Sequence, residues 1–284
     1  MSIKRVGIVG SGIMGSGIAE AAAKSGFEVV LRSRSQASAD AMAAGMEKSL
    51  AKQVEKGKLD PSDSEAAMSR LTAVSDLGEL AGCDLVIESV VEDLGVKRHL
   101  FTELDRICQE GAILATNTST LPVVEMAMET GRPEKVCGIH FFNPAPVMEL
   151  VEVVRPITAS DETIDVAKGF AEACGKSPVE VKDQAGFIVN SLLFPYLNNA
   201  VRLLEQGVAT RDGIDTAMKG GCGFPMGPFA LLDLVGLDTS LAILDALYAE
   251  FRDPNYAAVP LLRRMVAAEQ LGRKSGQGFY DYRK

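Results

Sequence analysis

The sequence has few of the residues on which disulfide-rich and metal-binding proteins depend. Its 284 residues include five cysteines, two histidines and no tryptophan. The cysteines stand singly without a C-x-x-C pair, so their spacing indicates neither a disulfide framework nor a zinc site, and we expect no metal. The five thiols are predicted to be free and buried; they are Cys83, Cys108, Cys137, Cys174 and Cys222.

Long apolar runs and an excess of positive charge are also missing. No run reaches the roughly 18 apolar residues that span a bilayer, and the first residues, Met1–Arg5, lack the layout of a signal peptide. The sequence therefore predicts a soluble, cytoplasmic protein with no membrane partner. Its net charge of −9 opposes nucleic-acid binding, which depends on Lys and Arg at the phosphates.

A glycine-rich turn is the strongest local motif in the chain. An apolar strand leads directly into G-x-G-x-x-G and then into a helix. The glycines permit a sharp exit from the strand, close approach of a pyrophosphate to the backbone, and close packing of the helix on the sheet. Free N–H groups at the helix start would hold the diphosphate. We assign dinucleotide binding to the turn that contains Gly10, Gly12, Ile13, Met14 and Gly15.

Short strand-like segments alternate with helical ones as far as about residue 183. This alternation predicts a doubly wound, Rossmann-type α/β domain with a largely parallel sheet. The expected strands are Arg5–Val9, Glu28–Leu31, Leu71–Val74, Leu85–Ile87, Ala112–Ala115, Val136–His140, Leu150–Val154 and Val179–Val181. Residues 36–70 are rich in helix formers and are predicted to form a helical excursion away from the sheet.

The pattern changes after Asp183 to long amphipathic helices, which predicts an all-helical second domain. The length favours two domains, and we place them at residues 1–184 and 185–284. The expected helices are Ala185–Gln206, Thr210–Lys219 and Gly227–Phe251, with a break at Gly220–Pro225 and a kink at Pro195. We expect this domain to line the substrate cleft and to form a homodimer, because helices such as Gly227–Leu241 carry much apolar surface. Packing within one domain is the alternative.

One of the two histidines, His140, ends an apolar strand and precedes two prolines that favour a turn. A chain that returns antiparallel about residue 146 places position 152 opposite position 140. Glu152 can then bind one ring nitrogen of His140, which fixes the tautomer and raises the basicity of the other nitrogen, as a general base acting on an alcohol requires. A structural histidine beside a solvated glutamate is the alternative. The other histidine, His99, lies in a charged run and is predicted to be at the surface.

Seven motifs, spread over nearly the whole chain, are Gly10–Gly15, Val86–Glu92, Asn117–Leu121, His140–Pro144, Gly186–Asn190, Pro225–Pro228 and Gly272–Tyr280. Together they resemble those of the short-chain L-3-hydroxyacyl-CoA dehydrogenases, in particular the bacterial members that act on 3-hydroxybutyryl-CoA. The resemblance implies reversible hydride transfer between a nicotinamide cofactor and the C3 carbon of an acyl-CoA, here (S)-3-hydroxybutyryl-CoA or acetoacetyl-CoA.

The resemblance also implies roles for individual residues. His140 would be the acid/base and Glu152 its partner, while Ser119 and Asn190 would bond the reacting oxygen of the substrate. Cofactor contacts are implied for Glu92, Lys97, Asn117, Asn143 and Lys274, and contacts with the CoA phosphates for Lys52 and Lys56.

Some of these residues have structural alternatives. Ser119 can cap a helix before Pro122. The two lysines proposed for CoA can face solvent or pair with the neighbouring Glu55 and Asp60, and Lys274 can be a solvated residue of a basic turn.

The chain departs from the family at the end of the second strand. The family commonly places an Asp there to hold the adenosine ribose, whereas this sequence has Ser33 followed by Arg34. Ser33 can donate to a 2′-phosphate and Arg34 can bind it through two N–H groups. The pair therefore predicts NADP as the cofactor, with NAD as the alternative. Gly15 is more usual in NAD enzymes, and Arg32 can be a surface residue without bearing on the choice.

Two other functions compete with the main hypothesis. A β-hydroxyacid or sugar-acid dehydrogenase would keep the fold, but such enzymes typically use a lysine as acid/base, which the pairing of His140 with Glu152 opposes. A non-catalytic dinucleotide sensor would have no need of that pair.

Overall fold

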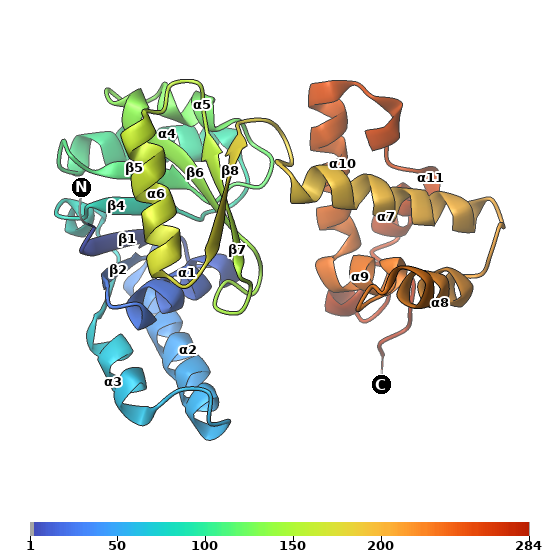
Figure 1. Cartoon of the computed structure of the whole chain (residues 1–284), viewed down its shortest axis with the longest axis horizontal. Helices are drawn as coiled ribbons and strands as arrows, with labels where there is room; N and C mark the ends of the chain where they lie inside the picture. Colours follow the sequence, from blue (N-terminus) through green and yellow to red (C-terminus); the bar gives the residue numbers. More distant parts are fainter. Residues whose placement is uncertain (1–2, 284) are drawn as a thin grey trace. The chain divides into compact units, whose positions relative to one another are not determined.

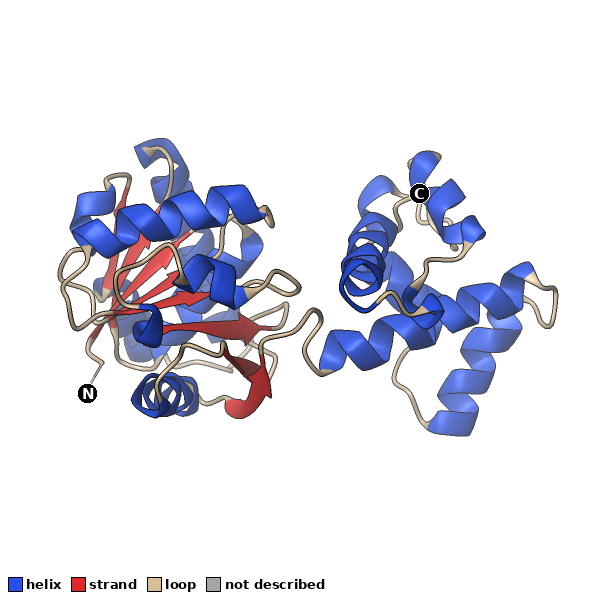
Figure 2. Ribbon diagram, turned by 90° about the horizontal axis from the view of Figure 1, so that it is seen from above, coloured by secondary structure: helices blue, strands red, loops and turns tan. Residues whose placement is uncertain are grey.

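The structure is a computed structural model in which residues 3–283 are described. The chain divides into two compact units, Met1–Gln184 and Ala185–Lys284. The first unit has one sheet with helices on both faces, and the described part of the second is built from helices (Figure 2). The predicted fold class, a Rossmann-type α/β domain followed by an all-helical domain, is confirmed.

The sheet of the first unit has eight strands in the order β3-β2-β1-β4-β5-β6-β7-β8. The strands are β1 (Arg5–Val9), β2 (Glu28–Arg32), β3 (Leu71–Val74), β4 (Leu85–Glu88), β5 (Ile113–Thr116), β6 (Val136–Phe141), β7 (Leu150–Arg155) and β8 (Ser177–Lys182). Every neighbouring pair is parallel except β6 and β7, which are antiparallel. All eight predicted strands are present, and their ends agree within two residues.

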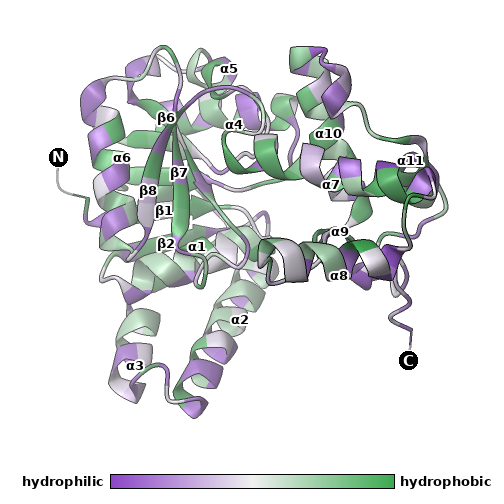
Figure 3. Ribbon diagram, turned by 45° about the vertical axis from the view of Figure 1, so that its right-hand side comes forward, coloured by the Kyte–Doolittle hydropathy of each residue, from purple (hydrophilic) through white to green (hydrophobic). Residues whose placement is uncertain are grey.

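The central strands are apolar except for polar residues at or near their carboxyl ends, because helices cover both faces of the sheet. Strands β4 and β5 are fully buried, and Figure 3 shows the apolar colour of β6 and β7. The covering helices are α1 (Ile13–Lys24), α4 (Leu94–Ile107), α5 (Val123–Ala127) and α6 (Asp161–Ala173), with short 3₁₀ turns η1 (Leu77–Leu80) and η2 (Pro133–Lys135). The carboxyl ends of β1, β2, β4 and β5 therefore share one edge, where ligands of such sheets bind.

The predicted helical excursion is confirmed as two helices, α2 (Gln36–Glu55) and α3 (Pro61–Ser69). They lie side by side and extend away from the sheet (Figure 1). Ser35 begins α2 by accepting a hydrogen bond from the Ser38 backbone N–H, which satisfies one of the unpaired donors of the first turn. Helix α2 then buries Met42, Met46 and Leu50 at helical spacing.

The second unit packs its helices around one apolar core. The helices are α7 (Val189–Glu205), α8 (Arg211–Cys222), α9 (Pro228–Val235), α10 (Leu237–Phe251) and α11 (Pro260–Ala267), with 3₁₀ turns η3 (Pro254–Tyr256) and η4 (Arg273–Ser275). Phe194, Leu197, Phe229 and Leu244 are among its buried side chains. Pro195 lies inside α7.

Three helix boundaries in this unit differ from the prediction. The first helix begins at Val189 and not at the expected Ala185, because Gly186 and Phe187 have positive φ values of 76° and 46° that a right-handed helix does not allow. The single helix expected over Gly227–Phe251 is two helices, because Gly236 has a φ of 102° that interrupts the hydrogen-bond ladder. The break expected at Gly220 begins instead at Gly223, which ends α8 with a φ of 69°. Both breaks depend on a positive φ, which glycine composition alone does not locate.

Two buried aspartates fix the C-terminal segment of the second unit. Asp233 is 1% exposed and accepts hydrogen bonds from the backbone N–H groups of Phe279 and Tyr280, both at 2.8 Å. Asp215 accepts from the Phe229 N–H at 2.9 Å and from the Tyr280 hydroxyl at 2.9 Å. Burial raises the pKa of the Asp233 carboxyl. These bonds give the last motif of the chain a defined conformation.

Four of the five cysteines are buried free thiols as predicted, but Cys222 is exposed. Cys222 ends α8 beside the positive-φ Gly223, where the helix has left the core. Burial raises the pKa of the Cys137 thiol to about 12, so this thiol stays protonated and inert. Among residues 3–283, none of the helices combines the length and the apolar content that crossing a bilayer requires.

Candidate active site

The glycine-rich turn between β1 and α1 leaves room for a dinucleotide. A Cβ atom on Gly10, whose φ is 141°, would lie 2.2 Å from the Ser89 carbonyl oxygen, and one on Gly15 would lie 2.4 Å from the Gly10 oxygen. A Cβ on Gly12 would meet nothing within 4 Å. Gly12 at the start of α1 provides no side-chain cap, so the first N–H groups of this helix, which include those of Ile13 and Met14, have no intrahelical partner. This cradle fits a diphosphate.

Ser33 and Arg34, the two residues from which NADP binding was predicted, follow β2 and differ in their exposure to solvent. Arg34 is exposed. Ser33 is only 2% exposed, and within the described chain its hydroxyl has no hydrogen-bond partner. The neighbouring Arg32 donates from Nε to the Ser75 carbonyl at 3.1 Å, so its guanidinium is held against β3. Of these two arginines, Arg34 is therefore the one that an anion can reach.

The predicted pair of His140 and Glu152 is present. The two residues face each other across antiparallel β6 and β7, and His140 Nδ1 lies 2.8 Å from Glu152 Oε2. His140 is 4% exposed and Glu152 is fully buried. The ring of Phe142 packs against the imidazole with its centroid 4.6 Å away. A carboxylate at Nδ1 holds the proton there and leaves Nε2 to act on a substrate.

Ser119 follows β5 and lies at the second ring nitrogen of His140. Its Oγ is 3.0 Å from Nε2. The alternative role of Ser119 as a helix cap is wrong, because Asp183 accepts from the first two backbone N–H groups of α5, at Val123 and Val124. Ser119, His140 and Glu152 thus form one hydrogen-bonded line at the carboxyl edge of the sheet.

Asn117 connects the loop after β5 to strand β6. Its side-chain oxygen accepts a hydrogen bond from the Phe141 backbone N–H at 2.8 Å. This contact holds the residue next to His140, and Asn117 is otherwise half-buried. The contact with a cofactor predicted for Asn117 stays a prediction.

Lys97 has a different environment from the one predicted. Its side chain is 1% exposed, and its ammonium lies 2.7 Å from Glu88 and 3.2 Å from Glu92. This burial leaves no surface of Lys97 for a direct contact with a cofactor. Glu92 is 41% exposed, so of the two predicted residues it is the one that a cofactor can reach.

The two lysines predicted to meet CoA lie at the end of α2. Lys52 and Lys56 are both exposed, and within the described chain neither forms the alternative ion pair with Glu55 or Asp60. Their ammonium groups are available to an anion. Asn143 is exposed in the turn between β6 and β7, and its cofactor contact stays a prediction.

Two predicted site residues lie in the second unit. Asn190 is 8% exposed in the first turn of α7. Lys274 lies in η4 with its Nζ 2.5 Å from Asp238, so it is paired rather than only solvated. The roles predicted for both residues stay predictions. His99 has a side chain that is 78% exposed, which confirms the prediction of a surface residue.

Sequence reasoning missed Glu88 and Asp183. Glu88 is the last residue of an otherwise apolar strand, and a carboxylate at the end of a buried strand is a signal that sequence alone can supply. Asp183 caps α5 from 60 positions away in the sequence, and no local pattern indicates that contact.

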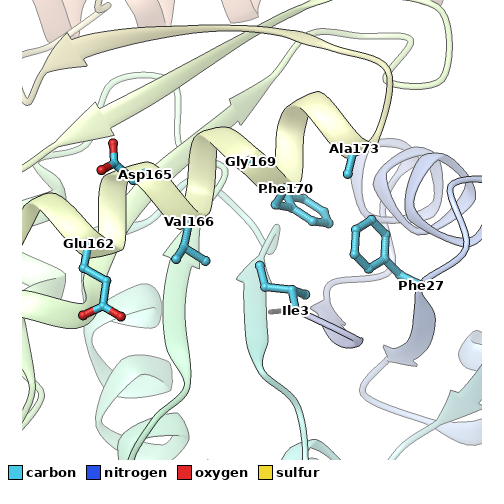
Figure 4. Close-up of a pocket in the computed structure, with 8 residues that line it drawn as sticks. All are labelled: Ile3, Phe27, Glu162, Asp165, Val166, Gly169, Phe170 and Ala173. Atoms are coloured by element: carbon cyan, nitrogen blue, oxygen red, sulfur yellow. The ribbon is translucent and has the colours of Figure 1, made fainter. Parts of the chain in front are cut away.

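A separate cavity of about 650 Å³ lies where α6 passes the amino ends of β1 and β2. Its lining includes Ile3, Phe27, Phe170 and Val166, with the carboxylates of Glu162 and Asp165 farther along α6 (Figure 4). None of the predicted site residues lines it. Among residues 3–283, no group of His, Cys, Asp or Glu side chains is arranged to hold a metal ion.

The chain is similar to known proteins over its whole length. A family model described as 3-hydroxyacyl-CoA dehydrogenase, NAD binding domain, matches residues 5–184, and the C-terminal domain of the same family matches residues 186–282. The chain is 46% identical to a 3-hydroxybutyryl-CoA dehydrogenase of Clostridioides difficile over 99% of this chain and 100% of that protein. It is 43% identical to the human mitochondrial hydroxyacyl-coenzyme A dehydrogenase over 99% of this chain and 92% of that one.

A solved structure agrees with these relationships. The crystal structure of the (S)-3-hydroxybutyryl-CoA dehydrogenase PaaH1 from Ralstonia eutropha superposes with a TM-score of 0.97 at 42% identity, and each chain is covered completely. Both the sequence and the fold lead to the same assignment, and the chain belongs to the 3-hydroxyacyl-CoA dehydrogenase family of nicotinamide-dependent oxidoreductases.

Proposed function

We propose that the chain interconverts (S)-3-hydroxybutyryl-CoA and acetoacetyl-CoA, with His140 as the acid/base. The observation that carries this proposal is the line from Ser119 through His140 to Glu152, with bonds of 3.0 and 2.8 Å. Relatives at 46% identity over nearly the whole chain bear the name of this activity. The pair of His140 and Glu152 also favours this reaction over that of a lysine-dependent hydroxyacid dehydrogenase.

The geometry assigns a task to each member of the line. In the direction of oxidation, His140 Nε2 accepts the proton of the C3 hydroxyl, and the buried Glu152 carboxylate stabilises the imidazolium that results. Ser119 Oγ donates a hydrogen bond to the oxygen that becomes the carbonyl. A nicotinamide cofactor held at the turn that contains Gly10, Gly12 and Gly15 would supply the acceptor for the hydride that leaves C3. In the direction of reduction, the same imidazolium returns its proton to the oxygen.

The glycine cradle and Glu92 would hold the cofactor on this side of the sheet. The open space above Gly12 and the uncapped start of α1 would receive the diphosphate. Glu92, which is 41% exposed, would accept hydrogen bonds from hydroxyl groups of the cofactor. The exposed Lys52 and Lys56 attract the phosphates of CoA despite the negative net charge of the chain.

The activity is tested by following the oxidation of reduced nicotinamide cofactor in the presence of acetoacetyl-CoA. His140→Gln should lower kcat by about 10²–10⁴-fold, the range that a positioned acid/base supplies, with little change in cofactor affinity. His99→Gln is the matched control, because that histidine is at the surface, and it should retain full activity. Near-normal turnover in His140→Gln would remove His140 from the mechanism.

We further propose that NADP is preferred over NAD, through Arg34. No carboxylate is present at the end of β2 to repel a 2′-phosphate, and Arg34 is exposed there. A hydrogen bond to a charged group contributes about 1.5–3 kcal/mol, which we reduce to about 1–2 kcal/mol because Arg34 is open to solvent. This corresponds to roughly a five- to thirty-fold preference. Ser33 is 2% exposed, and within the described chain its hydroxyl has no hydrogen-bond partner. Ser33 would therefore add to the preference for NADP only if its side chain moved to reach the 2′-phosphate.

The preference is measured as kcat/KM with NADPH divided by kcat/KM with NADH. Arg34→Ala should lower this ratio about five- to thirty-fold, and Ser33→Asp should invert it by restoring the carboxylate that favours NAD. Arg32→Ala is the matched control, since its guanidinium is bound to the Ser75 carbonyl. A parent enzyme that favours NADH, or a ratio unchanged in Arg34→Ala, would contradict the proposal.

A homodimer formed through the second unit is also proposed. Part of the region expected at the interface packs inside the second unit, as the alternative of packing within one domain predicted. These residues are Phe229, Leu232 and Leu237. Leu192 and Leu234 support association, since they are 72% and 50% exposed and apolar groups gain from burial against a second copy. Sedimentation equilibrium measures the assembly, and a monomer at micromolar concentration would refute it.

A further inference from the structure

Glu88 is a fully buried carboxylate to which the proposed reaction assigns no task. It is the last residue of β4 and is 0% exposed. Its Oε1 accepts from Lys97 Nζ at 2.7 Å and from the Val90 backbone N–H at 2.6 Å, and its Oε2 accepts from the Thr116 hydroxyl at 2.7 Å. Both oxygens of this carboxylate thus accept hydrogen bonds, and both accept from Lys97 Nζ.

The same ammonium contacts a second carboxylate that leads to the site. Lys97 Nζ lies 3.2 Å from Glu92 Oε2. The other oxygen of Glu92, Oε1, accepts from the Thr118 hydroxyl at 2.5 Å and from the Ser119 backbone N–H at 2.9 Å. The side chain of Ser119 then meets His140 Nε2 at 3.0 Å. A continuous series of hydrogen bonds and one ion pair, which we call the Glu88 chain, therefore runs from Glu88 through Lys97 and Glu92 to the backbone of Ser119.

Stability alone gives a weak reason for this arrangement. Replacing a buried ion pair by neutral groups of similar volume is often neutral or stabilising, because desolvation offsets the Coulomb attraction. Glu92 is 41% exposed, so its carboxylate can also turn toward water. Lys97 adds a buried positive charge to the Thr118 hydroxyl and the Ser119 N–H as partners of this carboxylate, and so favours the orientation that meets the Ser119 N–H.

We propose that Glu88 and Lys97 are positioning residues for the reaction. They hold the Glu92 carboxylate against the loop after β5, and the loop in turn presents the Ser119 hydroxyl to His140 and to the substrate oxygen. The inference rests on the proposed function, and it explains why a lysine at this edge of the sheet is buried between carboxylates. A displacement of Ser119 by even a fraction of an ångström weakens a bond made in the transition state.

The test is the double variant Glu88→Gln/Lys97→Met, which removes both charges together and leaves no buried charge unpaired. At saturating acetoacetyl-CoA and cofactor, kcat should fall about ten-fold relative to the parent. The same double change introduced into Ser119→Ala should alter kcat by less than about two-fold, because the hydroxyl that the Glu88 chain positions is already absent. Such non-additivity identifies residues that act through one another.

Two further variants keep the test decisive. Leu104→Ala removes a fully buried side chain of the same helix, α4, without touching the Glu88 chain, and it should lower the melting temperature but leave kcat unchanged. If the double variant does not fold, Glu92→Ala replaces it, since a half-exposed residue is tolerated. At saturating cofactor it should give the same loss of kcat, and that loss should again vanish in Ser119→Ala.

If the double change lowers kcat equally in the parent and in the Ser119→Ala background, or lowers it in neither, the positioning role of Glu88 and Lys97 is overturned. The parent and His140→Gln are assayed alongside. If the parent reduces acetoacetyl-CoA and His140→Gln does not, the proposed function is upheld, whatever the kcat of the double variant. A parent without acetoacetyl-CoA reduction overturns the function itself.

Discussion

Replacing Glu152 with Gln isolates the contribution of its negative charge. The side chain is fully buried and its Oε2 lies 2.8 Å from His140 Nδ1. Glutamine keeps the length and an oxygen acceptor, so it preserves a neutral hydrogen bond while removing the charge that stabilises the imidazolium. A charge-assisted hydrogen bond is roughly twice as strong as a neutral one, with typical values of about 1.5–3 against 0.5–1.5 kcal/mol. The difference is about 1–2 kcal/mol.

Because the pair is buried, solvent does not screen this difference. It corresponds to a fall in kcat of about five- to thirty-fold, less than the loss expected for removing His140 itself. In the direction of oxidation the imidazolium forms along the reaction coordinate and is absent from the bound substrate complex, so kcat and kcat/KM should fall together while KM stays constant. Initial rates of (S)-3-hydroxybutyryl-CoA oxidation, measured over a range of both substrates, provide these constants.

Glu149→Gln is the matched control for this measurement. Glu149 is exposed, lies directly before β7, and its substitution changes the net charge by the same amount. It should leave kcat within about two-fold of the parent, and thermal denaturation of both variants checks that each is folded. A kcat of Glu152→Gln within about two-fold of the parent, or an equal loss in Glu149→Gln, would refute the reasoning that the buried charge stabilises the imidazolium.

Three other predictions follow from the described contacts. Lys52→Glu together with Lys56→Glu should raise KM for acetoacetyl-CoA and weaken its salt dependence, and an unchanged KM would place CoA elsewhere. Asp183→Ala should lower the free energy of unfolding by about 1–2 kcal/mol, since two N–H groups of α5 lose their cap, which calorimetry would record as a melting temperature lower by about 2–8 °C. Glu180→Gln should destabilise the chain at pH 7 by less than about 1 kcal/mol, because the pair with Arg155 is exposed. The hydrogen bond from Arg155 lowers the pKa of Glu180 in the folded state. The stabilisation by this pair is therefore complete above the ordinary pKa of a glutamate and is lost as the pH falls through the folded-state pKa. A difference in the free energy of unfolding between parent and variant that persists in strong acid would contradict this prediction.

Much of the site was predictable because its geometry is local. The glycine turn between β1 and α1 depends on residues that are adjacent in the sequence, and their missing Cβ atoms are the physical cause of the cradle. The meeting of His140 with Glu152 follows from a turn centred near residue 146, since antiparallel pairing fixes which residues face each other. The motif at Ser119 follows a strand whose carboxyl end must lie at the ligand-binding edge.

Burial and long-range contacts were not predictable in the same way. A lysine in an amphipathic helix has the same sequence signature whether it faces water or two carboxylates, and only the tertiary contact of Lys97 with Glu88 at the end of β4 decided that Lys97 is 1% exposed. The same holds for Ser33, which lies under the surface at the end of β2. The break of the long helix at Gly236 depends on a φ of 102°, which the packing of the second unit selects.

The sequence by itself determined the order of strands and helices along the chain, the change to an all-helical second unit, and the pairing of His140 with Glu152. It did so because hydrophobic period, turn residues and strand register act over a few neighbouring positions. Tertiary structure alone decided which charged groups are buried together, as in the contact of Glu88 with Lys97 and Glu92, and which group caps α5 from 60 positions away. These contacts depend on which distant segments exclude water from one another, and that exclusion exists only once the chain has folded.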